Sequence, residues 1–202
     1  MNYGSIRTHF KATLNRSDIT DTLADTFIDQ GIGRIQRSLR IPAMEGQHTY
    51  TFTTATSSVF LPSNFLEIID LYYDNTSLIR LPMKEMQNVS DGNETGNPVY
   101  FCREGGNLLI MPRPSSGKLV LNYYASFPEM TSDSDENILA AIASDLIMYS
   151  ALTYASDYYL DERTDVFEGK YQQFMNELQE QANDQEIVGT IQAIRPSYYI
   201  DY

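Results

Sequence analysis

The chain has 202 residues, with 14 Lys and Arg against 27 Asp and Glu and a formal net charge of −13. This acidic balance argues against a general nucleic-acid-binding protein, which would carry a basic surface. The single cysteine, Cys102, excludes an intrachain disulfide framework and a Cys-rich zinc site, and it fits a reducing compartment. No apolar stretch approaches the roughly 18 residues that span a bilayer, and the first residues lack signal-peptide character, so we expect neither a membrane protein nor secretion.

The first forty residues predict two helices. Ile6, Phe10 and Leu14 lie four residues apart, which indicates a short amphipathic helix over residues 5–16. Helical spacing continues from Thr20 to Arg40, with Asp18 or Thr20 as the cap and Pro42 beyond the end. Gly31 and Gly33 inside the second helix indicate a close neighbouring backbone or a kink, or they are tolerated defects; these alternatives stay open.

Between about residues 46 and 126 the period changes to two-residue alternation, which predicts an antiparallel β module. Asp74–Ser77 and Glu104–Gly106 are typical of tight hairpins, and the polar stretch Gln87–Asn97 of an exposed loop. The candidate strands are His48–Thr53, Val59–Leu61, Leu66–Tyr73, Leu78–Leu81, Val99–Arg103, Asn107–Met111 and Lys118–Tyr124.

Helical spacing returns after Pro128. Asp133, with Glu136 three residues later, suggests a cap for a slim central helix. The positions predicted on one face of that helix are Ile138, Ile142, Leu146, Tyr149 and Thr153. The chain turns near residues 157–164, and a fourth helix ends near Ala182.

These elements predict an α+β fold in three parts. Residues 1–45 and 129–183 form a helical bundle, residues 46–128 form an inserted antiparallel β module, and residues 184–202 form an extended C-terminal arm. The arm is too apolar to be only a solvated tail, so it is expected to bind a partner surface.

Residues that carry catalysis or bind metal are sparse. His9 and His48 are the only histidines and lack metal-ligand spacing, and no Gly-x-Ser-x-Gly motif occurs. Asp133, Asp135 and Asn137 match three calcium-loop positions, but the required Gly and Glu are missing, so capping is the better interpretation. We therefore expect no enzyme activity, no catalytic or metal site and no cofactor.

Two features point to interfaces. The chain has 15 tyrosines, with adjacent pairs beginning at Tyr72, Tyr123, Tyr158 and Tyr198. In a strand, one member of a pair packs inward and the other is displayed, either to a partner or simply to water at the edge of the β core. Charge is also uneven, at +2 for residues 1–40, −4 for 41–130 and −11 for 131–202, so the ends would attract each other within one chain or between copies.

Taken in order, a series of motifs resembles the head-to-tail adaptor proteins of tailed bacteriophages, of the tail tubular protein A type. The resemblance covers nearly the whole chain, and each motif is weak alone. The motifs are Tyr3-Gly4, Leu14–Asp18, Arg34–Glu45, Leu61–Glu67, Gly96–Tyr100, Met111–Pro114, Leu121–Tyr124 and Asp145–Tyr149.

The resemblance implies a structural virion protein at the head–tail interface, assembled in the host cytoplasm. Such adaptors form rings, typically dodecamers, that bind the portal protein and connect it to a tail or nozzle protein. DNA passes through the channel without specific binding during ejection, and no membrane is involved. The implied portal-docking arm comprises Ile187, Ile191, Ile194, Tyr198 and Tyr199.

Ring formation requires one face of a subunit to complement another. The expected subunit interface pairs a basic stripe with an acidic neighbour, namely Arg34, Arg37 and Arg40 with Asp161, Glu162 and Asp165. The expected distal contact with the tail is the polar loop, through Asn88, Asp91, Asn93 and Glu94.

Two alternatives stay open. One is another virion part, such as a neck stopper or tail completion protein. The other is a carbohydrate- or host-binding β module that uses displayed tyrosines, for which the candidates are Tyr72, Tyr73, Tyr123 and Tyr124.

Overall fold

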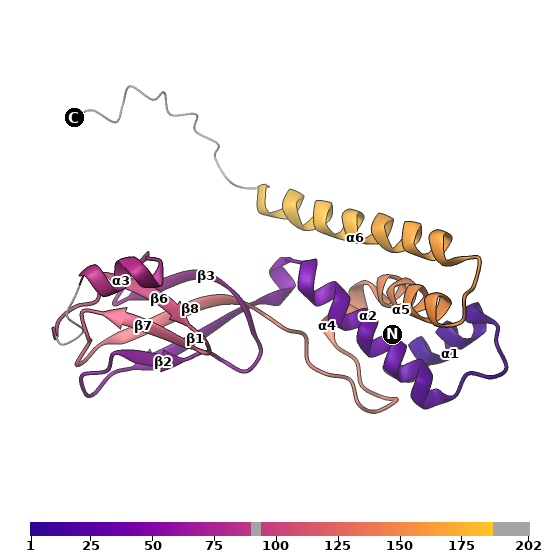
Figure 1. Cartoon of the computed structure of the whole chain (residues 1–202), viewed down its shortest axis with the longest axis horizontal. Coiled ribbons are helices and arrows are strands. Elements are labelled where there is room, and N and C mark those ends of the chain that lie inside the picture. The colour runs from indigo at the N-terminus through magenta and orange to yellow at the C-terminus, as the bar shows by residue number, and fades with distance from the viewer. Residues whose placement is uncertain (90–93, 188–202) are drawn as a thin grey trace, which may run out of the picture. The chain divides into compact units, whose positions relative to one another are not determined.

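A computed structural model describes residues 1–89 and 94–187 (Figure 1). The chain divides into two compact units. Met1–Pro42 and Glu129–Tyr202 make the first, which we call the helical unit, and Ala43–Pro128 makes the second, the β unit. Helices therefore come from both ends of the chain and the sheets from its middle. The predicted α+β class is confirmed.

The helical unit begins with two capped helices. Asn2 Oδ1 accepts a hydrogen bond from the Ser5 amide at the start of the first helix, and Thr20 Oγ1 accepts one from the Leu23 amide at the start of the second. These bonds satisfy amides that have no partner within the helix. The helices of the unit are α1 (Tyr3–Leu14), α2 (Asp21–Ser38), α4 (Ile138–Ile142), α5 (Ser144–Tyr158) and α6 (Thr164–Ile187).

Helix α5 is the centre of the unit, as its small residues predict. It contacts α1, α2, α4 and α6. Gly31 of α2 lies so close that an added Cβ would be 2.9 Å from the Ala151 amide nitrogen of α5. Beside this crossing, the buried Ser150 hydroxyl donates to the Gly31 carbonyl at 3.1 Å. Of the explanations offered for Gly31, the close neighbouring backbone is confirmed.

The prediction of a single central helix after Pro128 is wrong for the first part of that helix, because the structure has two helices there. Ala143, with φ −145° and ψ 51°, ends α4 and separates it from α5. The break turns Ile138 and Ile142 outward, to 46% and 49% exposure, so they do not share the buried face of α5. The N-cap of α4 is Asn137, whose side chain accepts from the Ala140 amide at 2.9 Å; Asp133 instead pairs with an arginine of α1.

The fourth predicted helix is longer than expected. Helix α6 continues five residues past Ala182 to Ile187, so the segment predicted as extended from residue 184 begins inside a helix. The Gln179 side chain stabilises this part, since it bonds both Asn183 one turn later and the backbone of Arg40 at the end of α2. Residues 188–202 lie outside the described part of the chain.

The β unit contains two four-stranded sheets, with strand orders β1-β8-β3-β4 and β2-β7-β6-β5. Seven predicted strands correspond to observed ones within a few residues, with a further two-residue strand before Leu78. The strands are β1 (Glu45–Thr51), β2 (Ser58–Phe60), β3 (Phe65–Tyr73), β4 (Thr76–Ser77), β5 (Ile79–Arg80), β6 (Tyr100–Glu104), β7 (Asn107–Met111) and β8 (Lys118–Ala125).

Both predicted tight hairpins are confirmed. Tyr73 pairs with Thr76 across Asp74 and Asn75, which both have positive φ, and Glu104 pairs with Asn107 across a turn where Gly105 has φ 57°. Positive φ at the turn matches the twist of the two strands that it joins.

Two features of the β unit depart from prediction. The pairing of β5 with β6 is parallel, so the module is not wholly antiparallel. A short helix, α3 (Met83–Val89), occupies the start of the segment expected to be a loop from Gln87. Helix α3 forms because it covers β6, burying Met86 and Cys102 to 1% exposure each.

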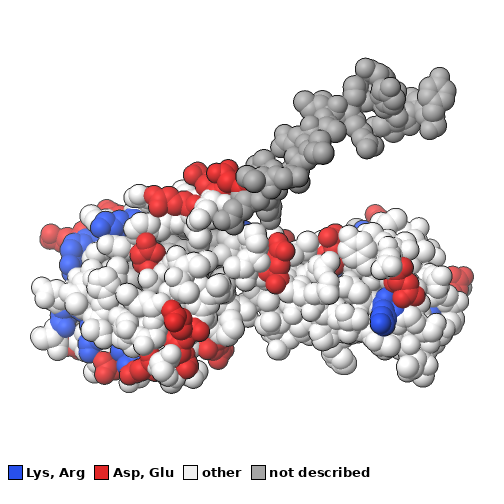
Figure 2. Space-filling view, turned by 180° about the vertical axis from the view of Figure 1, so that it is seen from behind, with Lys and Arg blue, Asp and Glu red and all other residues white. Residues whose placement is uncertain are grey.

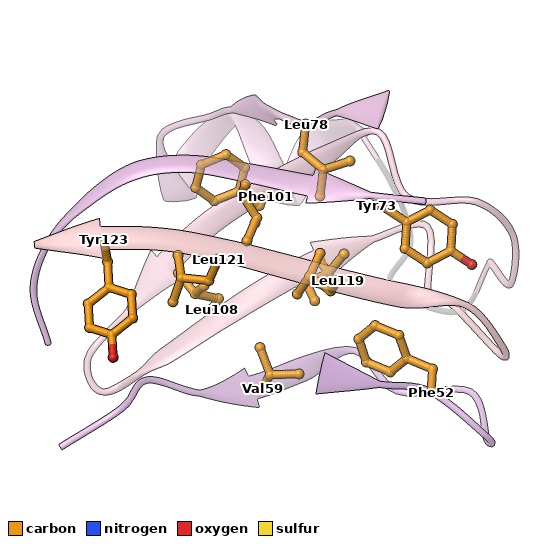
Figure 3. Packing of buried hydrophobic residues seen from close by; sticks show 11 residues of the cluster. Phe52, Val59, Tyr73, Leu78, Phe101, Leu108, Leu119, Leu121 and Tyr123 are labelled. Atoms are coloured by element: carbon orange, nitrogen blue, oxygen red, sulfur yellow. The ribbon is translucent and has the colours of Figure 1, made fainter. Parts of the chain in front are cut away.

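The core of the β unit lies between the two sheets (Figure 3). Leu119 and Leu121 of β8 point toward Leu108 of β7 and Phe101 of β6, and Tyr73 and Tyr123 lie at opposite ends of the cluster. Alternation along β7 and β8 places one face of each strand in this core. Burial of this face explains why the two-residue period was so clear in the sequence.

Candidate functional site

The basic stripe on α2 was expected to meet a neighbouring copy, but Arg34 has its partner within the chain. Its guanidinium donates two hydrogen bonds to the Glu168 carboxylate of α6, at 2.6 and 2.8 Å, and lies 3.9 Å from the centre of the Tyr171 ring. The bonds from Arg34 lower the pKa of Glu168, and burial raises the pKa of Tyr171. Arg34 therefore joins α2 to α6.

The other two arginines of the stripe differ in exposure. Arg37 is exposed and makes one long bond, 3.4 Å, to the Tyr154 hydroxyl. Arg40 is half-buried, and its guanidinium donates to the carbonyls of Gln36 and Leu39 at the end of α2. These contacts neutralise part of the negative end of the helix dipole. The three arginines of the stripe thus differ in what they contact.

The predicted acidic partners lie at the turn between α5 and α6. Asp161 forms an ion pair with Arg163, whose guanidinium lies 2.6 Å from the carboxylate and lowers the pKa of Asp161 to about 2. Glu162 and Asp165 are exposed. The structure therefore separates Asp161, which is bonded locally, from two carboxylates that face solvent.

Arg163 also connects this turn to α1. Its guanidinium donates to the carbonyls of Thr13 and Leu14, at 3.3 and 2.9 Å, which are the last carbonyls of α1. Nearby, the Arg16 guanidinium lies 4.1 Å from the centre of the Tyr159 ring and pairs with Asp18. The turn is thus held from two directions.

Three exposed apolar side chains surround this turn. Leu160 is 88% exposed and has φ +52°, in the left-handed region, while Tyr158 and Val166 are 63% and 58% exposed. We call Tyr158, Leu160 and Val166, with the turn that carries them, the α5–α6 corner. A branched residue with positive φ is uncommon, and such outliers concentrate at functional positions.

A polar network ties the start of α1 to α2 and to the segment before α4. The Arg7 guanidinium contacts Asp25 at 2.5 Å and Asp133 at 2.8 Å, and the Tyr3 hydroxyl donates to Asp29 at 3.2 Å. Burial raises the pKa of Tyr3 and of Asp29. These groups satisfy one another across three segments, which is the expected role of a structural network.

Figure 2 shows the basic side chains of the helical unit gathered at the end of the unit where α1 ends and α6 begins. Of the basic residues of the helical unit, Arg7, Lys11, Arg16 and Arg163 form ion pairs with carboxylates of the same chain. The helical unit as a whole has nine basic and nineteen acidic residues, a net charge of −10, and the β unit has five and eight, a net charge of −3. The excess negative charge therefore belongs to the helical unit.

The tyrosine pairs of the β unit behave largely as expected. Tyr73 and Tyr123 are 5% and 6% exposed, and their partners Tyr72 and Tyr124 are half-buried. One member of each pair is therefore in the core. The Tyr73 hydroxyl donates to the Ser116 carbonyl at 2.7 Å, which satisfies its buried polar end.

The β unit carries a pocket of about 390 Å³ at β5, α3 and β6. It is lined by Leu81, Pro82 and Met83, with Arg80 and Arg103 as its charged residues. In the described part of the chain, Arg80 has no hydrogen-bond or ion-pair partner. Arg103 donates to the Gly105 carbonyl at 3.2 Å and pairs with no described carboxylate. We call this feature the β5–α3 pocket.

Groups that could bind a metal ion lie apart in the described part of the chain. Within residues 1–89 and 94–187, no three His, Cys, Asp or Glu side chains lie close enough together to hold a metal ion. His9 is exposed, and the exposed His48 contacts the Tyr50 ring. No helix among the described residues has both the length and the apolar character to cross a membrane.

The remaining predicted contact residues are only partly described. Ile187 is the last residue of α6, whereas Ile191, Ile194, Tyr198 and Tyr199 lie outside the described residues. Of the predicted distal contact, Asn88 is exposed on α3 and Glu94 is exposed; Asp91 and Asn93 lie outside the described residues.

Sequence reasoning missed the α5–α6 corner and the β5–α3 pocket. The available signal at the corner was three apolar residues, Tyr158, Tyr159 and Leu160, in a segment expected to turn. The pocket depends on Arg80 and Arg103, which are 23 positions apart and meet only through the parallel pairing of β5 with β6.

Comparison with known proteins agrees with the resemblance found in the motifs. No curated protein matches the chain. A family model described as SU10 adaptor protein matches residues 1–194, which include both units and nearly all of the chain. The chain therefore belongs to the SU10 adaptor protein family, and its role is that of a structural adaptor of bacteriophage virions.

Proposed function

We propose that the protein forms a ring that joins the capsid portal to the tail and leaves a channel for DNA. The family match over residues 1–194 carries this proposal. Twelve copies would bind beneath the portal protein at the head–tail interface, after assembly in the host cytoplasm, and would contact a tail or nozzle protein on the far side.

The charge of the helical unit supports a channel role. With a net charge of −10 per copy, a ring of about a dozen copies would concentrate negative charge at the junction. Like charges repel, so a wall of this sign would limit adhesion of DNA as it passes. The protein would then conduct DNA without binding it specifically.

The contacts with partners are proposed from position and composition. Ile187 ends α6, and the segment that follows contains Ile191, Ile194, Tyr198 and Tyr199, which would dock onto the portal. A peptide that adds to a partner's sheet edge places alternate side chains in pockets of the partner surface. The polar residues Asn88, Asp91, Asn93 and Glu94 would contact the tail component.

The first experiment is mass analysis of the purified protein, alone and mixed with the portal protein of the same genome. We expect the adaptor to bind in a fixed ratio to the portal ring, close to one copy per portal subunit. A protein that stays folded but never binds the portal would refute portal joining and would favour a position lower in the tail.

A second experiment tests the docking segment. Deletion of residues 188–202 leaves α6 intact, so the truncated protein should keep its helical signal in circular dichroism while losing portal binding. The double variant Tyr198→Ser, Tyr199→Ser should weaken binding, and Gln192→Ala in the same segment serves as a matched control. Normal portal binding by the truncated protein would contradict the assignment.

A further inference from the structure

The α5–α6 corner presents an apolar knob. Leu160 is 88% exposed, and Tyr158 and Val166 on either side of it in the chain are 63% and 58% exposed. Water must order around these side chains in the isolated protein, and burial of apolar surface is the main favourable term in association. Exposed groups of this kind, close together, mark interaction sites more often than scattered single ones do.

The backbone at Leu160 strengthens this interpretation. Its φ of +52° is a conformation that glycine or asparagine adopts more readily, because a branched side chain is strained there. A leucine is therefore unfavourable at this position twice over, by its backbone and by its exposure. Such local conflicts point to a role beyond the stability of the chain that carries them.

The knob stands on a rigid base. Arg163 bonds Asp161 and the last two carbonyls of α1, and the Asp161 amide donates to the Ser156 carbonyl at 2.8 Å. Arg16 covers the Tyr159 ring at 4.1 Å. A turn whose backbone is already held in place loses little freedom when it binds, which favours affinity.

The charges around the knob are not balanced. Arg16 and Arg163 are neutralised by Asp18 and Asp161. In contrast, Asp157, Glu162 and Asp165 are exposed, and none of them forms an ion pair with a described residue. The knob therefore has an acidic rim.

The β5–α3 pocket has the opposite character. Its apolar lining residues are Leu81, Pro82 and Met83, which we call its floor, and its two charged lining residues are Arg80 and Arg103. Its volume of about 390 Å³ equals that of roughly a dozen water molecules at ~30 Å³ each, which leaves room for one leucine side chain and part of a neighbour. Lys84, exposed on α3, adds a further positive charge next to Met83.

We propose that the α5–α6 corner of one copy docks in the β5–α3 pocket of a second copy of this chain. Leu160 would enter the apolar floor, while Glu162 and Asp165 would face Arg80 and Arg103. This proposal names the contact between copies and rests on the ring proposed above. It replaces the basic half of the interface expected from the sequence, since Arg34 is already bonded to Glu168.

Complementarity of both polarity and charge selects a second copy as the occupant. The two surfaces lie on different units of the chain, so in a ring each copy would contribute a knob to one neighbour and a pocket to the other. Heterologous contacts generate rings when the rotation between copies closes. A variant that lacks the knob still has an intact pocket, and a variant with an altered pocket still has an intact knob. These two variants can therefore bind each other through the one intact contact.

The test uses the full chain in two variants, each with one half of the contact removed. Leu160→Asn removes the knob with a residue that suits the left-handed backbone, so folding is preserved. Arg80→Glu reverses the charge of the pocket at a residue without a partner in the described chain. Lys118→Glu, an exposed charge reversal in the same unit outside the pocket, is the matched control.

Association is measured by sedimentation velocity from about 1 μM to about 1 mM protein, a range that covers weak contacts. The buffer contains about 10 mM salt, where the Debye length is about 30 Å and charge pairs act at full strength. The wild type and K118E should form species larger than dimers. L160N and R80E alone should each associate at least about 30-fold more weakly, as for loss of a hot-spot residue.

Mixing L160N with R80E gives the decisive result. The intact pocket of L160N and the intact knob of R80E should form a one-to-one dimer that grows no further. The proposal is overturned if the wild type stays monomeric up to about 1 mM, if L160N associates as well as the wild type, or if the mixture forms no dimer. Portal binding by the wild type, measured separately, reports on the proposed function independently of this contact.

Discussion

The crossing of α2 and α5 gives the sharpest test of how the helical unit is packed. At Gly31, an added Cβ would lie 2.9 Å from the Ala151 nitrogen and 3.3 Å from two further backbone atoms of α5. Backbone cannot turn aside as a flexible side chain can, so Gly31→Ala must push the helices apart. At Gly33, two residues later, the nearest heavy atom is the end of the Arg37 side chain at 3.9 Å.

The magnitude follows from three contributions. Alanine favours the helix over glycine by about 1 kcal/mol. Overpacking a well-filled interior costs about 1–3 kcal/mol, and separation of the helices would also stretch the 3.1 Å bond from Ser150 to Gly31, with a further cost of about 1 kcal/mol or more for a buried hydroxyl. Gly31→Ala should therefore lower the free energy of unfolding by about 2 kcal/mol. Gly33→Ala, which has only the first contribution, should raise it by up to about 1 kcal/mol.

Urea unfolding followed by far-ultraviolet circular dichroism measures this difference, because helices dominate that signal. For an m-value of about 2 kcal/mol/M, the midpoint should fall by about 1 M for Gly31→Ala and rise for Gly33→Ala. If Gly31→Ala is as stable as the wild type, α2 and α5 have room to accept a methyl group and the close crossing does not determine the packing.

Three further predictions concern single contacts. Arg34→Ala should destabilise the helical unit by about 1–2 kcal/mol in urea unfolding, because the half-exposed Glu168 loses two charged hydrogen bonds. Asp161 should titrate near pH 2 by NMR, and Arg163→Met should return its pKa toward the ~3.9 of a free aspartate. Gly117→Ala should destabilise the β unit by about 2 kcal/mol or more, because φ is +85° and its Cβ would lie 2.5 Å from a carboxylate oxygen.

Each of these has a control and a contrary result. Arg37→Ala removes an exposed arginine with one long bond and should change stability little; equal effects at positions 34 and 37 would contradict the pairing with Glu168. Gly106→Ala, with open space around it, is the control for Gly117. Because the folded pKa of Asp161 is lowered, its contribution to stability is present above about pH 4 and is lost as the pH falls toward 2. A titration midpoint near 4 in the wild type would contradict the bond to Arg163.

Local periodicity accounts for the parts of the fold that were predicted correctly. Ile6, Phe10 and Leu14 are all buried at 0% or 1% exposure, as one face of a helix requires, and alternation marked the strands of the β core. Caps and turns were readable where the residue type itself supplies the bond or the backbone conformation. Thr20 caps α2, and Asp74 and Asn75 adopt positive φ in the hairpin.

Features set by tertiary contacts could not be read in the same way. Ile138 and Ile142 continue the helical spacing of Leu146, yet the break at Ala143 turns them to solvent. Helix α3 contains polar residues typical of a loop, but Met83 and Met86 hold it against β6. In both places the neighbouring segment determined the structure, and intrinsic preference did not.

For the candidate interfaces, too, some features could be predicted from the sequence and others depended on tertiary contacts. Sequence reasoning predicted an interface from the charges of α2 and of the turn before α6, because the positions of charged residues are visible in the sequence. It could not tell which charges already have partners, since Arg34 and Glu168 are 134 positions apart in the chain. Pairing within the chain removes Arg34 and Asp161 from the charges available to a neighbour, and it leaves Glu162 and Asp165 exposed.

The contact that we propose between copies uses groups that folding leaves unsatisfied. Folding buries the periodic apolar residues and pairs most cations of the helical unit, so neither set can direct association. Among the described groups that remain are a strained, exposed Leu160 with an acidic rim, and an Arg80 side chain without a described partner beside an apolar floor. The apolar, acidic surface around Leu160 and the apolar, basic surface around Arg80 are complementary. The proposed contact therefore explains both the strained, exposed leucine of the helical unit and the arginine of the β unit that has no partner among the described residues.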